Sequence, residues 1–81
     1  DPARHARHAV KVLVKYHLME ERSQPLTELV RWAEGTPLLC GLWERYPPAG
    51  LRTPAAWIEQ VVGELAGSGA LRVDGGVVYD A

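Results

Sequence analysis

Residues 57–79 read WIEQVVGELAGSGALRVDGGVVY, and this stretch decides the fold prediction. Its first part predicts a helix, because apolar residues recur at the spacing of one helix face. These residues are Trp57, Ile58, Val61, Val62 and Leu65. Gly67-Ser68-Gly69 breaks that helix, and two short apolar runs, 70–73 and 77–79, then flank the turn residues Asp74-Gly75-Gly76. This arrangement predicts a β-hairpin closed by a glycine-rich turn.

Two Thr-Pro pairs mark the starts of helices upstream. Thr53-Pro54 opens the helix described above, to about Gly67, because Thr caps a helix and Pro in the first turn loses no hydrogen bond. Thr36-Pro37 repeats the device and predicts another helix, which ends before Pro47-Pro48. Residues 36–52 therefore form a short helix followed by a Pro-rich loop.

The N-terminal part predicts two more helices. A short helix is expected over residues 28–34, capped by Thr27 and stopped by Gly35, and Pro25-Leu26 before it is expected to be extended. A long helix is predicted over residues 3–22 from the three- and four-residue spacing of its apolar positions. Its inward side is Ala6, Val10, Leu13, Val14 and His17, and Val12, Tyr16 and Met19 widen the apolar face.

One edge of the long helix is basic. At about 100° per residue, six side chains fall within about a quarter-turn of one another. They are Arg4, Arg7, His8, Lys11, Lys15 and Arg22, and we call them the basic stripe. Three interpretations stay open: a solvated helix edge, a contact with an acidic protein, or a contact with nucleic acid. The sequence pI of about 6.3 weighs against nucleic acid.

Length and composition narrow the class of protein. Eighty-one residues with a net charge of −1 and 47% hydrophobic residues predict one globular domain. The chain begins at Asp1 without Met, so we expect a piece of a longer protein. A single cysteine cannot form an internal disulfide, and no apolar run predicts a membrane span or a signal peptide. We therefore expect an intracellular location, cytoplasmic or nuclear.

The predicted order of elements resembles the winged helix–turn–helix superfamily. The resemblance covers most of the chain, and residues 57–79 are similar to the third helix and wing of that superfamily. It implies a mainly α, winged-helix-like fold with three to four helices and a small C-terminal β-hairpin. It also implies that Leu71 tucks under the helices and that residues 77–79 return beside the first wing strand. The segment 36–52 departs from the pattern as an insertion.

DNA-binding members of that superfamily insert the third helix into the major groove. The outward face predicted for the corresponding helix here contains two carboxylates and no Lys or Arg, which opposes binding to phosphates. That face is Ala56, Glu59, Gln60, Gly63, Glu64 and Gly67. On the wing, Arg72 and Asp74 roughly cancel. The sequence thus predicts a non-catalytic protein–protein interaction, adaptor or regulatory module. The alternative is a winged-helix DNA-binding domain that contacts the backbone through the basic first helix and the wing.

Further residues are candidates for partner contact. Gly63 lies within a helix, where Gly costs about 1 kcal/mol relative to Ala. Three interpretations stay open for it: close approach of another chain, packing against segment 36–52, or a glycine that is merely tolerated. Trp43 and Tyr46 in the inserted segment are candidates because Trp and Tyr are frequent at interface hot spots. The alternative for Trp43 is a place in the core, where Trp57 is also expected.

Catalytic and metal-binding chemistry is not predicted. His5 and His8 have a spacing that can bind zinc, but a site needs further ligands that the sequence does not supply. His17 is expected at the boundary of the core, and Cys40 is expected to be a small buried residue. We therefore predict no enzyme activity, no cofactor, no metal and no small-molecule substrate, and we expect a protein partner.

Overall fold

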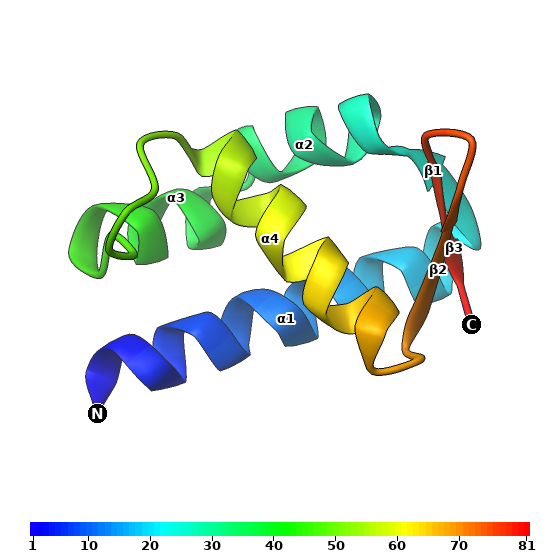
Figure 1. Ribbon diagram of the computed structural model, residues 1–81. Helices are drawn as coiled ribbons and strands as arrows, with labels where there is room; N and C mark the ends of the chain where they lie inside the picture. Colours follow the sequence, from blue (N-terminus) through cyan, green and yellow to red (C-terminus); the bar gives the residue numbers. More distant parts are fainter.

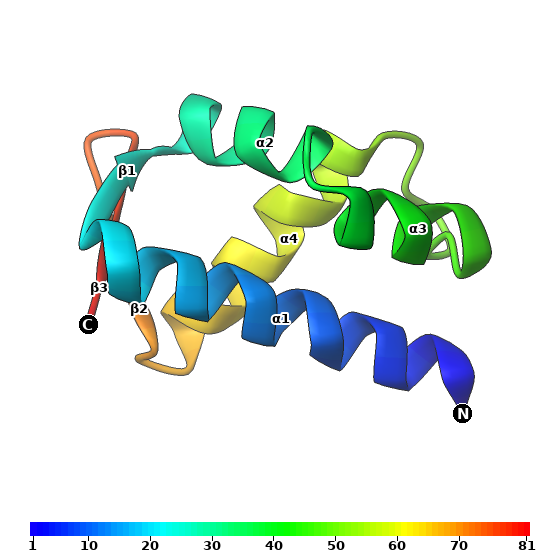
Figure 2. The same cartoon turned by 180° about the vertical axis from the view of Figure 1, so that it is seen from behind.

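A computed structural model describes residues 1–81, and α4 crosses between α1 on one side and α2 and α3 on the other (Figure 1, Figure 2). The elements follow in the order α1 (Pro2–Glu21), β1 (Ser23–Pro25), α2 (Leu26–Glu34), α3 (Pro37–Arg45), α4 (Pro54–Gly67), β2 (Leu71–Asp74) and β3 (Val77–Asp80). The fold is mainly helical with a small antiparallel sheet, as predicted. The arrangement is compatible with a winged-helix-like fold, and α3 lies in segment 36–52, which the resemblance treats as an insertion.

The sheet contains three strands in the order β1-β3-β2, all antiparallel. The predicted hairpin is confirmed, with Asp74 paired to Val77 across its turn. Gly75 and Gly76 form that turn with φ of 58° and 77°, a conformation that glycine adopts without steric cost. The prediction missed β1 as a strand, because it expected only an extended Pro25-Leu26. Three residues of β1 pair with β3, a partner more than fifty positions away.

The three threonines predicted as caps behave differently. Thr53 confirms its prediction, because its Oγ1 accepts a hydrogen bond from the Ala56 N–H at 3.1 Å. Thr36 takes the N-cap position of α3, but its hydroxyl donates to the Trp32 carbonyl at 2.7 Å and makes no cap bond.

Thr27 lies inside α2, so its predicted cap role is wrong. The helix begins one residue earlier, at Leu26, whose N–H donates to the Gly76 carbonyl at 2.9 Å. Strand β1 therefore leads directly into α2. The hydrogen bond from Leu26 to the hairpin turn satisfies an N–H at the start of this helix, where a side-chain cap was expected.

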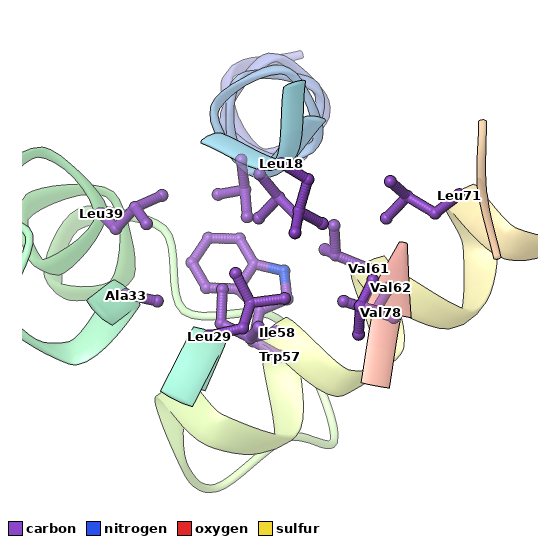
Figure 3. Close-up of a cluster of buried hydrophobic side chains, with 12 residues drawn as sticks. Leu18, Leu29, Ala33, Leu39, Trp57, Ile58, Val61, Val62, Leu71 and Val78 are labelled. Atoms are coloured by element: carbon purple, nitrogen blue, oxygen red, sulfur yellow. The ribbon is translucent and has the colours of Figure 1, made fainter. Parts of the chain in front are cut away.

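One buried cluster joins the helices to the sheet, and Figure 3 shows the Trp57 indole near its centre, beneath α1. Its members are Val10, Val14, Leu18, Leu29, Ala33, Leu39, Trp57, Ile58, Val61, Val62, Leu71 and Val78. The prediction that Leu71 tucks under the helices is confirmed, since this side chain is 3% exposed. None of the helices combines the length and the hydropathy needed to cross a lipid bilayer.

The apolar face predicted for the first helix is too wide. Val12, Tyr16 and Met19 are 37%, 62% and 46% exposed, whereas Val10 and Val14 are fully buried. At about 100° per residue, the exposed three lie on the opposite side of α1 from the buried ones. The neighbouring elements pack on one side of α1 only, which is why these three residues stay outside the core.

Candidate functional site

A cleft of about 380 Å³ lies where the N-terminal part of α1, the chain after α3 and the helix α4 meet. Arg4 and Arg7 border it from α1, and Trp57 and Gln60 border it from α4. Tyr46, Pro48 and Ala49 close it from the inserted segment. The cleft thus brings together residues of three surfaces that sequence analysis predicted separately: the basic stripe, the insertion and the outward face of α4.

The cleft has one free cation at its border. The Arg4 guanidinium is exposed and makes no ion pair within the chain. The Asp1 carboxylate also borders the cleft and accepts a bond from the Ala3 N–H at 3.1 Å. The indole N–H of Trp57 has no hydrogen-bond partner, but it is buried in the core. The free donors of Arg4 suit a ligand that offers oxygen atoms.

Most of the basic stripe is used inside the domain. Arg7 and Lys11 both pair with the Glu64 carboxylate of α4, the second at 3.1 Å. Lys15 pairs with Asp80 of β3 and donates to the Ala70 carbonyl at 2.7 Å. This edge of α1 is therefore the seam with α4 and the sheet. Helix angles predicted that these cations share one edge of α1, but they could not show which carboxylates of other elements would lie beside that edge.

The other three members of the basic stripe make none of these ion pairs. Arg4 and His8 are exposed and lie outside these ion pairs. Arg22 lies beyond the end of α1, with φ of 72°, so it does not continue the edge of the helix.

The outward face of α4 is smaller than predicted. Glu59, Gln60 and Gly63 are exposed, as is Gly67, whereas Ala56 is half-buried. Glu64 is also half-buried and turns toward α1, which supplies its two cations. The exposed part of the face keeps one carboxylate and no Lys or Arg.

Gly63 is open to solvent. A Cβ added at this position would meet no atom within 4 Å. Packing of Gly63 against segment 36–52 is therefore excluded, and partner contact or a merely tolerated glycine are the interpretations that stay open.

The aromatic residues of the inserted segment have separate positions. Trp43 is half-buried, and its ring lies 5.6 Å from that of Trp57 at an interplanar angle of 48°. This contact fits the interpretation of Trp43 as part of the core. Tyr46 is half-buried at the wall of the cleft.

The histidine and cysteine side chains form no cluster. His17 stacks on Trp32 with ring centroids 3.8 Å apart, and its Nε2 is 2.8 Å from Gln24 Oε1. This boundary position is the one predicted. Cys40 is half-buried and its thiol donates to the Glu34 carbonyl at 3.1 Å. No group of three or more His, Cys, Asp or Glu side chains is arranged to hold a metal ion.

The β2-β3 hairpin carries one cation, Arg72, which already contacts other residues of the hairpin. The Arg72 guanidinium lies 4.3 Å from the centroid of the Tyr79 ring and 3.7 Å from the Asp74 carboxylate. The strand register explains the first contact, since Arg72 is directly opposite Tyr79. Sequence analysis noted only that the charges of Arg72 and Asp74 cancel.

Comparison of the chain with protein-family models, with curated proteins and with solved structures gives no match.

Proposed function

We propose that this domain is a non-catalytic protein-interaction module with a winged-helix-like fold, acting within a larger protein or assembly. Its partner occupies the cleft and the adjoining outward face of α4. The observation that carries the proposal is the convergence of Arg4, Tyr46 and Gln60, from three different parts of the chain, on one cleft.

The charges support a polypeptide partner over DNA. Affinity for duplex DNA depends on cations that displace counterions from phosphates. Arg7, Lys11 and Lys15 are paired with carboxylates of the same chain. The outward face of α4 offers Glu59, which would repel phosphates.

The shape of α4 supports close approach of another backbone. Gly63 has free space above it, and Gln60 one turn earlier borders the cleft. A segment of protein that lies along this face would reach the cleft with its own oxygen atoms, either carbonyls or carboxylates. Arg4 and Gln60 would then donate hydrogen bonds to it.

A matched pair of glycine variants tests the proposal. Gly63→Arg fills the outward face of α4, whereas Gly41→Arg places the same side chain on α3, also exposed and with no atom within 4 Å. The domain is used as bait in an extract of the cells that produce it. We expect a partner that the wild type and Gly41→Arg retain equally and that Gly63→Arg retains at least about tenfold less, a loss of about 1.4 kcal/mol in binding free energy.

A titration with duplex DNA tests the alternative function. Tight binding at about 50 mM salt that weakens steeply by about 200 mM salt would show that the domain contacts phosphates through the first helix and wing. That result, or equal retention of partners by the two glycine variants, would refute the proposal.

A further inference from the structure

The outer side of α1 carries an apolar surface that the cleft does not include. Val12, Tyr16 and Met19 are exposed and lie four and three residues apart, so they form one stripe along the helix. With Leu65 of α4 they border a shallow groove of about 300 Å³. We call these four residues the α1 groove. Leu65 belongs to the C-terminal part of α4, whereas Arg4 and Arg7 place the cleft at the N-terminal end of α1; the course of the two helices is seen in Figure 1.

The domain's own core does not need this surface. Val10, Val14 and Leu18 on the other side of α1 are fully buried and already anchor the helix. A helix that packs on one side is expected to carry polar residues on the other. Large apolar side chains in a row on the solvent side are typical of a surface that another molecule covers.

The charges around the groove indicate what covers it. His8, Lys11 and Lys15 line the groove beside the apolar residues. None of the residues that line the groove is Asp or Glu, and Glu20 follows one turn after Tyr16 on the helix. Lys15 already donates to Asp80, Ala70 and Ala81 and has no N–H left for a ligand. Lys11 shares the single Glu64 carboxylate with Arg7, so one positive charge of this pair is uncompensated, and the Lys11 side chain remains 34% exposed. A second copy of this chain would bring a like-charged rim against this one, which disfavours self-association.

We infer that the α1 groove binds an acidic amphipathic helix of a partner protein. Apolar residues of that helix, spaced three and four apart, would pack against Tyr16, Met19 and Leu65, as in other helix-in-groove complexes. Its flanking Asp or Glu side chains would accept hydrogen bonds from His8 and Lys11. This surface is additional to the cleft and does not depend on the function proposed for it.

Two synthetic peptides of about 18 residues test the inference, a length at which a helix can form on binding. Both carry the same leucine stripe, and one has glutamate where the other has lysine. Binding is measured by fluorescence anisotropy of the labelled peptides. We expect the glutamate peptide to bind the wild-type domain at least about tenfold more tightly than the lysine peptide.

Variants locate the binding surface. Tyr16→Glu is expected to weaken the glutamate peptide at least about tenfold. Leu38→Glu is the matched control, because Leu38 is 59% exposed but lies on α3. This variant should bind the glutamate peptide as tightly as the wild type does. Circular dichroism confirms that each variant is folded.

Four outcomes would overturn the inference. Equal affinity for the two peptides would remove the role of charge, and unchanged binding by Tyr16→Glu would place the peptide elsewhere. Dimerisation in sedimentation runs that Tyr16→Glu abolishes would make the groove a self-association surface. Binding to anionic phosphatidylglycerol vesicles that Tyr16→Glu abolishes, without binding to the glutamate peptide, would make the occupant a lipid surface.

Discussion

Helices α1 and α4 pack against the same core but present opposite kinds of surface to solvent. The solvent side of α4 is small and polar, with Glu59, Gln60 and Gly63. The solvent side of α1 is large and apolar, with Tyr16 and Met19 at its centre. This difference is the basis of the two proposals: α4 leaves room for a backbone to come close, and α1 offers side-chain area.

The largest expected effect separates the two sides of α1. Leu18→Ala removes a fully buried side chain from the core and should lower the free energy of unfolding by about 2–5 kcal/mol. Tyr16→Ala, on the exposed side, should change it by less than about 0.5 kcal/mol. Urea denaturation followed by circular dichroism measures both. Similar losses for the two variants would mean that the outer side of α1 also supports the fold.

A glycine on the outer side of α4 gives the next effect. Gly63→Ala should raise the free energy of unfolding by about 1 kcal/mol, because Ala is the better helix former and its Cβ meets no atom within 4 Å. Gly76→Ala is the contrasting control and should destabilise, since φ there is 77°. Thermal unfolding measures the two changes. A loss of stability in Gly63→Ala would show that this part of α4 packs against something in the domain.

The ion pairs between α1 and α4 give a smaller effect. Glu64→Gln removes the charge that Arg7 and Lys11 share and should lower the free energy of unfolding by about 0.5 kcal/mol, since these pairs are partly exposed. The loss should shrink as salt is raised. Glu59→Gln, which removes a carboxylate without an ion pair, should leave stability unchanged. If the two variants behave alike at low salt, the basic stripe contributes nothing to the seam.

Local chemistry accounts for the parts of the fold that the sequence predicted. Thr53-Pro54 begins α4, and Gly75 and Gly76 close the hairpin, because each depends on the residues at that position alone. Strand β1 was missed because it exists only through pairing with β3. Thr27 failed as a cap for the same reason, since a bond from Leu26 to the hairpin turn starts α2.

The sequence predicted which residues share a helix edge in the candidate sites, but not which residues of other elements lie beside them. Helix angles showed that Arg7 and Lys11 lie on one edge of the first helix, but only the packing shows Glu64 beside them. The meeting of Tyr46 with Gln60 at the cleft depends on how the inserted segment folds back. The exposed stripe on α1 could have been predicted from the sequence, because helix angles place Val12, Tyr16 and Met19 opposite Val10 and Val14. The predicted apolar face was too wide because it joined both sets of residues.

The smallest expected effect on stability is also the one that best separates folding from binding on α1. Tyr16→Glu should change the free energy of unfolding by no more than about 0.5 kcal/mol, since Tyr16 is 62% exposed. The new carboxylate lies four residues from Glu20, which disfavours it slightly. Val14→Glu is the matched control, because the same charge at a fully buried position should unfold the domain. A domain that keeps its stability in Tyr16→Glu but loses the acidic peptide would show that this tyrosine serves a partner and not the core. A large loss of stability would instead place Tyr16 among the residues that hold α1 in position.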